Sequence, residues 1–344
     1  MDSYLWFDKY APKSLNELSY NPTSTKILQS LAGCEDFPHL IFYGVEGAGK
    51  KTRINAFLEA VYGKGVRKVT TESREFKVNS TATEYFITSS NFHIEMNPSD
   101  LAQKDKYLIQ SILKETASSS QIDQKSQKKF KVVVILEADK LTRDAQASLR
   151  RTMEKYSSNC RIIMACNSLS KIIPPIRSRC LAIRVGAPSE QEIKDILFDI
   201  SNKENSKIGP NVIPSIINSC EGNLRRAINC LQLCHLKGNT ASSLSYKEDV
   251  KKVYTSLTSN SKSVQTLSTV RQMLFNIIVS GIAPELFLLS ILNFFMTDKK
   301  ISDDKKLAII DAAVFYDLRV QNGSKAIAHL EAFSAKVLCI LSTN

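Results

Sequence analysis

The sequence predicts a three-layer α/β domain followed by helical domains, on three observations. Short apolar runs at residues 39–43, 131–136 and 161–166 are typical of buried strands, because parallel strands covered on both faces are apolar throughout. Helical patterns separate these runs, and strand–helix–strand repeats place parallel strands in one sheet between two layers of helices. From Pro188 onward only helical patterns recur. The predicted sheet therefore belongs to the first half of the chain.

The α/β domain begins with the strand at 39–43, which leads into a glycine-rich segment. A helix is expected from about 50 to 62, and alternating stretches at 84–88 and 92–96 predict strands. Apolar residues then recur at helical spacing over 106–116. This order supplies three strands and the helices that connect them.

The centre of the sheet comes next along the chain. Residues 131–136 (KVVVIL) form a continuous β-branched run, and 161–166 and 180–185 predict two more strands. A helix over 142–156 separates the first two of these strands, with Thr142 placed as its N-cap.

Domain boundaries follow from the turn residues. Pro188 ends the last strand, and Ser189 and Glu192 have the spacing of a capping box that starts a helix. A stretch rich in small and polar residues at 238–245 predicts a linker. We therefore expect an α/β domain over 1–186, a small helical domain over 187–240 and a second helical domain over 241–344.

The composition narrows the class of protein. With 46 Lys and Arg against 34 Asp and Glu, the net charge of +12 suits a polyanion such as nucleic acid, or simply a basic soluble surface. The first residues lack the apolar core of a signal peptide, and no apolar stretch predicts a membrane span.

The eight cysteines form no C-x-x-C pair, so we expect reduced core thiols. Cys230, Cys234 and His235 could bind a metal in principle, but no further ligands stand at zinc spacing, and we predict no metal site.

The glycine-rich segment 44–52 (GVEGAGKKT) matches the phosphate-binding pattern G-x-x-x-x-G-K-[ST] at all but one position. Its glycines let backbone N–H groups turn toward a phosphate at a helix N-terminus. Lys51 stands where a hydroxyl would hold Mg²⁺. A glycine turn without a ligand is the alternative, but the strand before and the helix after it favour nucleotide binding. The predicted binding residues are Gly44, Val45, Glu46, Gly47, Ala48, Gly49, Lys50, Lys51 and Thr52.

The strand at 131–136 ends in a second altered motif. ATPases of this type end the strand in Asp-Glu, where Asp orients Mg²⁺ and Glu polarises the attacking water. Glu137 is present here, but Leu136 occupies the Asp position. The metal side of the site, where Mg²⁺ would bind, therefore lacks both the hydroxyl at position 51 and the Asp at position 136. For this reason we expect metal-assisted hydrolysis to be weak or absent. In the alternative interpretations, Glu137 and Asp139 are solvated carboxylates at a strand end, or a pair at the N-terminus of the next helix that stabilises it.

Three polar residues near predicted strand and helix ends are further candidates. Arg179 follows two prolines and could stabilise a phosphate on a neighbouring chain, or form a surface salt bridge. Asn167 could sense a phosphate or merely form a turn. Arg225, at the start of a helix, could face a phosphate or solvent.

A resemblance to a known family is carried by WFDKYAPKSL from Trp6, the glycine loop, LRRTME at 149–154, ACNS at 165–168, IRSRC at 176–180 and GNLR at 222–225. Together these motifs resemble those of the AAA+ sliding-clamp loaders. More narrowly they resemble the small subunits of eukaryotic replication factor C, above all the fungal-like fifth subunit, which ends the pentamer and has a degenerate ATP site. One departure is Ala11, where the family usually has Arg. The resemblance runs from residue 6 to about 230.

The resemblance implies an AAA+ P-loop domain, a helical lid domain and a helical collar domain, in that order. It implies that Arg179 is an arginine finger acting in trans and that Glu137 is a vestigial catalytic residue. It also implies that Asn167 and Arg225 are sensors 1 and 2, and that Phe7 and Ser19 line the adenine pocket.

The implied function is ATP-dependent loading of a sliding clamp onto primer–template DNA, in the nucleus. The chain would bind ATP or ADP with little hydrolysis, with Mg²⁺ doubtful, so whether it is itself an enzyme stays open. Implied partners are four other replication factor C subunits, a PCNA-type clamp and the DNA backbone, with no membrane. An active ATPase in which Thr52 supplies the hydroxyl, and a scaffold without nucleotide, are the alternatives.

The remaining predictions concern contacts with DNA and the clamp. DNA would be held through its phosphates, and Arg150, Arg151 and a helix opening at Ser99 are candidates. Ordinary helix-surface charge and a helix cap explain these residues equally well. The clamp-facing surface would lie around 98–115, where apolar residues could serve a partner or the core.

Overall fold

The computed structural model describes residues 5–78, 81–97, 105–118, 130–157, 159–206, 212–220, 222–237, 246–259, 264–322 and 325–342. The chain forms two compact units, Met1–Ala241 and Ser242–Asn344. Each unit has its own hydrophobic core, and each is described by itself.

A seven-stranded sheet in the order β2-β3-β4-β5-β6-β1-β7 forms the centre of the first unit. The five strands from β4 to β7 in that order are parallel, as predicted, whereas β2 and β3 pair antiparallel. The strands are β1 (His39–Tyr43), β2 (Thr70–Val78), β3 (Thr81–Ser89), β4 (His93–Met96), β5 (Lys131–Ile135), β6 (Cys160–Cys166) and β7 (Cys180–Arg184).

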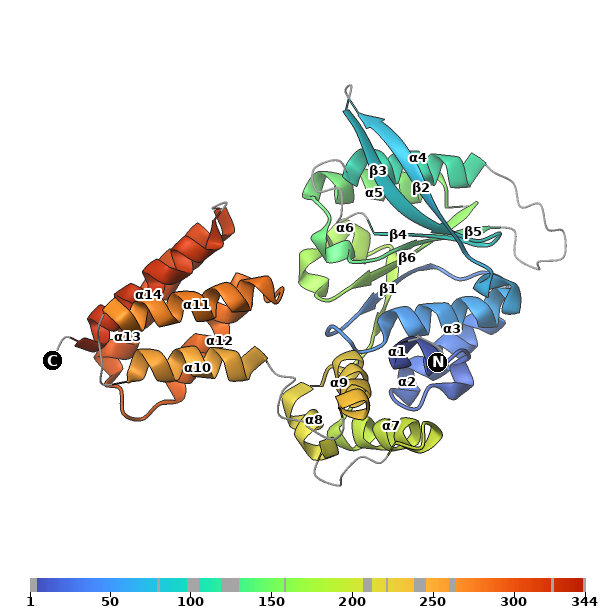
Figure 1. Ribbon diagram of the computed structural model, residues 1–344. Helices are drawn as coiled ribbons and strands as arrows, with labels where there is room; N and C mark the ends of the chain where they lie inside the picture. Colours follow the sequence, from blue (N-terminus) through green and yellow to red (C-terminus); the bar gives the residue numbers. More distant parts are fainter. Residues whose placement is uncertain are drawn as a thin grey trace. The chain divides into compact units, whose positions relative to one another are not determined.

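Helices cover both faces of the sheet, which confirms the three-layer prediction (Figure 1). Alternate residues of β5 show the division, because Val133 and Val134 point to opposite cores. The core on one face contains α4 (Asp105–Ser118) and α5 (Arg143–Lys155), and the other contains α2 (Pro22–Gly33) and α3 (Lys50–Tyr62).

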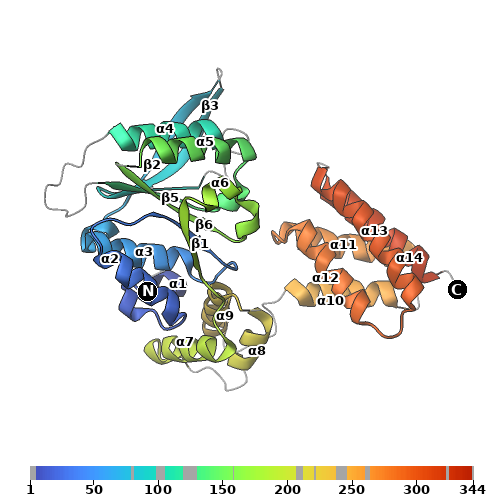
Figure 2. The ribbon, with the colours of Figure 1, turned by 180° about the vertical axis from the view of Figure 1, so that it is seen from behind.

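The first unit continues into α7 (Glu190–Lys203), α8 (Val212–Cys220) and α9 (Leu224–Lys237), which lie together (Figure 2). The predicted capping box is present, since the Ser189 and Glu192 side chains each bind the other's backbone N–H. Thr142 also caps α5 as predicted, accepting from Ala145 N at 3.2 Å. The short elements are α1 (Trp6–Lys9), α6 (Pro174–Arg177) and the 3₁₀ helices η1 (Leu15–Glu17), η2 (Lys64–Arg67), η4 (Ala138–Lys140) and η5 (Leu169–Lys171).

The second unit consists of helices around one core, in which Phe287, Phe295 and Phe333 are fully buried. Among the described residues, no helix of the chain has the length and apolar character needed to cross a membrane. The helices are α10 (Tyr246–Thr258), α11 (Val264–Val279), α12 (Pro284–Thr297), α13 (Asp303–Asn322) and α14 (Ala326–Ser342).

Candidate nucleotide-binding site

The glycine loop joins the end of β1 to the start of α3, at the edge of the sheet where parallel strands end. Gly47 and Gly49 have φ of 73° and 77°, in the left-handed region that favours glycine. A Cβ on Gly47 would lie 1.8 Å from Asn223 Oδ1, and one on Gly49 would lie 2.3 Å from the Tyr20 hydroxyl. The loop therefore brings backbone amides close to two other segments in a way that side chains at these positions would prevent.

Lys50 lies across this loop. Its ammonium donates to the carbonyl oxygens of Gly44 and Val45 at 2.8 and 2.9 Å and to Asn167 Oδ1 at 2.8 Å. Burial lowers the pKa of Lys50, and the nearby Cys166 and Asp139 oppose that shift. The structure thus brings Lys50 and Asn167 together from α3 and the end of β6.

Lys51 stands in the loop at the position where the phosphate-binding pattern has a hydroxyl. The ammonium of Lys51 forms an ion pair with the carboxylate of Glu95 on β4. Leu136 packs against the core beneath α2 and α3. Glu137, with φ of 51°, pairs with Lys140 Nζ at 2.8 Å. No hydroxyl at position 51 and no carboxylate at position 136 is present, so these residues do not fit a magnesium ion.

The N-terminus of α9 reaches the loop from the helical part of the unit. Asn223 caps this helix, since its Oδ1 accepts from Arg226 N at 3.1 Å. The Arg225 guanidinium lies 5.9 Å from the centre of the Phe7 ring. Two predicted site residues from opposite ends of the unit's sequence therefore lie side by side, whereas Ser19 is exposed.

The segment before α2 is anchored by a buried arginine that the sequence analysis did not identify. Arg53 is fully buried, with Nη1 3.0 Å from Thr25 Oγ1 and its guanidinium 4.8 Å from the centre of the Tyr20 ring. The Tyr20 hydroxyl donates to Ala48 O at 2.9 Å. The only sequence signal for this role is the position of Arg53 beside Ile54 on the buried side of the helix.

Further contacts hold the N-terminal segment despite Ala11. Trp6 N donates to Gln232 Oε1 of α9 at 3.0 Å. Glu204, at the end of α7, accepts from the Tyr10 hydroxyl and pairs with Lys9 at 2.7 Å. The N-terminal segment is therefore fixed to the helices that bring Arg225 to the loop.

Arg179 lies at the end of the parallel strands opposite to the glycine loop. It immediately precedes β7, which pairs with β1 from His39↔Cys180 to Tyr43↔Arg184. The glycine loop follows the far end of β1. The five paired residues of strand span four steps of ~3.3 Å each, so the two ends of the strands are roughly 13 Å apart. Arg179 and Lys50 therefore lie at opposite ends of the parallel strands.

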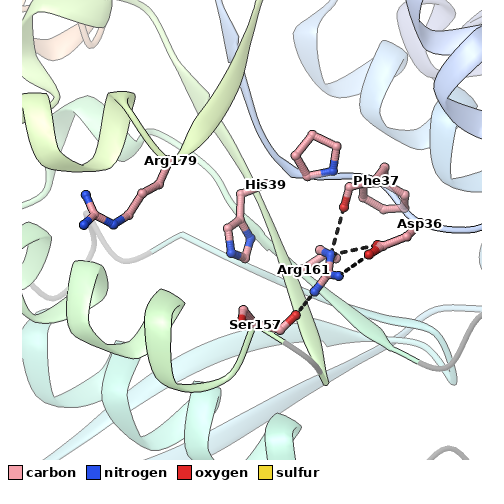
Figure 3. A pocket seen from close by; sticks show the side chains of 7 residues that line it. Asp36, Phe37, His39, Ser157, Arg161 and Arg179 are labelled. Atoms are coloured by element: carbon pink, nitrogen blue, oxygen red, sulfur yellow. Dashed lines mark hydrogen bonds and ion pairs between the residues drawn. The ribbon is translucent and has the colours of Figure 1, made fainter.

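The Arg179 side chain borders a pocket of about 520 Å³ that is lined also by Asp36, Phe37, Pro38, His39, Ser157 and Arg161. Figure 3 shows Arg179 and Arg161 on opposite sides of His39. Arg161 binds Asp36 at 2.6 Å. Arg179 is held instead by Glu154 Oε1, 2.6 Å from its Nη2, and by Pro175 O, 2.7 Å from its Nη1.

The remaining predicted residues are dispersed. Arg150 and Arg151 are exposed on α5, and Ser99 lies outside the described residues. Leu108, Ile109, Ile112 and Leu113 are buried in the core, so the core alternative for the apolar residues of 98–115 is the correct one for these four. Within the described part of the chain, no three His, Cys, Asp or Glu side chains cluster as a metal site would require.

His39 gives a prediction for stability against pH. Burial and the charge of Arg161 lower its pKa to about 4 from 6.5, with Asp36 opposing, and its Nδ1 accepts from Ile162 N at 3.0 Å. Between these pKa values the unfolded chain binds the extra proton, so lowering the pH destabilises the folded state. Between pH 7 and pH 5 the chain should lose about 2 kcal/mol more than a His39→Asn variant. Denaturant titrations at both pH values measure this, and equal losses would contradict it.

A glycine loop at the strand ends, a parallel sheet between helices and a helical segment that reaches the loop define a nucleotide-binding protein of the AAA+ class. Thermotoga maritima RuvB, a Holliday junction branch migration motor, has the same fold, with a TM-score of 0.50 at 14% identity over 96% of this chain and 90% of that one. Three family models match the chain: DNA polymerase III delta subunit (residues 21–189), RCF1/5-like AAA+ ATPase lid domain (195–236) and replication factor C subunit 3 C-terminal domain (246–344).

Curated relatives match nearly the whole chain. Replication factor C subunit 5 of Saccharomyces cerevisiae is 42% identical, covering 98% of this chain and 99% of the relative. Replication factor C subunit 3 of Bos taurus is 41% identical, covering 98% and 96%. The chain therefore belongs to the replication factor C family of AAA+ clamp-loader subunits, as its motifs predicted.

Proposed function

We propose that this clamp-loader subunit binds nucleotide without hydrolysing it and contributes Arg179 to the nucleotide site of a neighbouring subunit. The observation that carries the proposal is the Lys51–Glu95 ion pair on the metal side of an otherwise complete glycine loop. A lysine ammonium there supplies positive charge but cannot orient a metal-bound water.

The residues present fit a nucleotide phosphate. The left-handed glycines, the ammonium of Lys50 and the N-terminus of α3 converge at the end of β1. Phe7 and Arg225 lie beside each other on the helical side. Bound ATP or ADP would supply phosphate charge that joins the loop to α9, so its role in this subunit is structural.

The fixed position of Arg179 supports the second half of the proposal. Because it stands at the opposite edge of the sheet from the glycine loop, it cannot serve the chain's own site without unfolding β7. An arginine presented at a protein surface can stabilise phosphate charge on another subunit. The neighbour is a further replication factor C subunit in this proposal, within a pentamer.

The wider assignments are proposals of the same kind. They comprise ATP-dependent loading of a PCNA-type clamp, contact of Arg150 and Arg151 with the phosphates of primer–template DNA, and action in the nucleus. Residues 1–186, 187–240 and 241–344 would be the AAA+, lid and collar domains. The family membership and the chain's net charge of +12 support them.

Lys51 predicts nucleotide binding that does not need magnesium. The purified chain should bind ATP or ADP with affinities that differ by less than about threefold between Mg²⁺ and EDTA, because Lys51 already supplies a cation. Lys51→Thr should make the affinity depend on Mg²⁺. Titration of a fluorescent nucleotide in both buffers measures this.

The matched control is Lys252→Thr, which removes an exposed lysine paired with Asp249 at 2.6 Å on α10. It should leave the wild-type behaviour unchanged. A tenfold loss of wild-type affinity in EDTA would favour the active ATPase in which Thr52 serves the metal. No binding in either buffer would favour the scaffold without nucleotide.

A further inference from the structure

Glu154 is the residue that holds Arg179. Its Oε1 lies 2.6 Å from Arg179 Nη2 and 3.5 Å from Arg150 Nε. The carboxylate stands in the last turn of α5, directly after Met153, which is buried in the core. The helix therefore fixes the point from which the Glu154 side chain reaches Arg179.

Arg179 is also held from the other side. Its Nη1 donates to the carbonyl oxygen of Pro175 at 2.7 Å, in the short helix α6 that precedes β7. A guanidinium is planar and has five N–H donors, so two bonds to separate acceptors restrain its plane and leave further donors. Arg179 is thus oriented by two elements while its side chain stays 35% exposed.

We propose that Glu154 is a positioning residue for the reaction at the neighbouring site: it orients Arg179 so that the remaining donors face the neighbour's phosphates. This inference rests on the proposed role of Arg179 in trans. A free arginine samples many rotamers. If it is held in one orientation before the subunits meet, the reaction no longer includes the entropy cost of ordering it. Glu154 itself touches neither nucleotide nor metal in this account.

An opposite role is chemically conceivable and gives the opposite result. If Glu154 held Arg179 away from the neighbour, its removal would free the arginine and raise turnover. The exposed pair is of a kind that contributes little to stability, so either effect should appear in the rate and leave folding intact.

The test uses the assembled clamp loader, reconstituted with wild-type chain, Arg179→Ala, Glu154→Ala or Glu154→Gln. The Arg179-dependent part of the ATPase rate is the difference between the wild-type and Arg179→Ala complexes. Glu154→Ala should reduce that part roughly tenfold through kcat, with KM changed less than twofold, because misorientation weakens contacts made in the reaction. Glu154→Gln keeps a hydrogen-bond acceptor and should restore most of it.

Glu59→Ala is the matched control, since it removes the partner of another surface arginine, Arg67, at 2.5 Å. It should leave the rate and the KM unchanged. If Glu154→Ala prevents assembly, Glu154→Asp, which keeps the charge but shortens the reach, should give an intermediate loss.

The outcomes separate the two proposals. An Arg179→Ala complex with wild-type turnover removes the proposed role of Arg179 itself. A loss with Arg179→Ala but none with the Glu154 variants, or a gain with Glu154→Ala, overturns only the positioning role of Glu154.

Discussion

Replacing Arg179 by alanine should lower ATP turnover by the assembled clamp loader while nucleotide binding by this chain stays unchanged. Arginines that act on a neighbour's phosphates contribute ~10³–10⁵ in rate, so turnover at the one site that Arg179 serves should fall about 10³-fold or more. Total ATP turnover by the complex then falls by the fraction that this site contributes. Steady-state ATPase assays of the complex and nucleotide titration of the isolated chain measure the two parts.

Arg177→Ala is the matched control for this prediction. Arg177 is exposed two residues earlier, at the end of α6, and its replacement removes the same charge without removing the residue bound to Glu154. Its complex should turn over ATP as the wild type does. An Arg179→Ala complex that is as active as the Arg177→Ala complex would show that the arginine acts on no neighbour.

Among the variants proposed for stability measurements, Arg53→Ala should cause the largest loss in the free energy of unfolding. The fully buried side chain fills space between α3 and the segment that carries Tyr20, and its truncation leaves a cavity and removes the bond to Thr25. Large-to-small changes of this kind cost about 3 kcal/mol or more in the free energy of unfolding. Nucleotide binding should weaken as well, because Tyr20 contacts the loop through Ala48.

Trp6, the single tryptophan of the chain, reports unfolding of the first unit by fluorescence in a denaturant titration. Arg67→Ala is the control, since it removes a surface arginine and should cost less than about 1 kcal/mol. Arg53→Met should cost less than Arg53→Ala, because it fills the space and removes a buried charge whose Nε has no hydrogen-bond partner among the described residues. Equal midpoints for Arg53→Ala and Arg67→Ala would contradict the anchoring role.

Elements with strong local signals could be predicted from the sequence. The run at 131–136 became β5, and the capping box at Ser189 became the start of α7, because burial and capping depend on nearby residues. Strand β2 was missed. Its sequence TTESREFKV is polar, and the strand lies at the edge of the sheet. It is held there by pairing with β3, so its sequence lacks the apolar pattern that marks a buried strand.

The residues proposed for the candidate site could be named from the sequence, but their contacts could not. The sequence predicted Lys51 and Leu136 as losses where Mg²⁺ would bind, but the pairing of Lys51 with Glu95 depends on how the fold brings β4 within reach of the start of α3. Similarly, Arg179 could be placed near a surface, but its bond to Glu154 depends on α5 and α6 packing together. Such contacts join residues far apart in sequence and follow only from the tertiary fold.

The central claim is that this chain keeps nucleotide without hydrolysing it. The most direct test is the rate at which the purified chain hydrolyses ATP with Mg²⁺, compared with its Glu137→Gln variant. We predict that both proteins bind nucleotide and that both hydrolyse it at the same background rate, because Lys51 and Leu136 leave Glu137 without a metal to act beside. Magnesium-dependent turnover by the wild-type chain that Glu137→Gln abolishes would contradict the account.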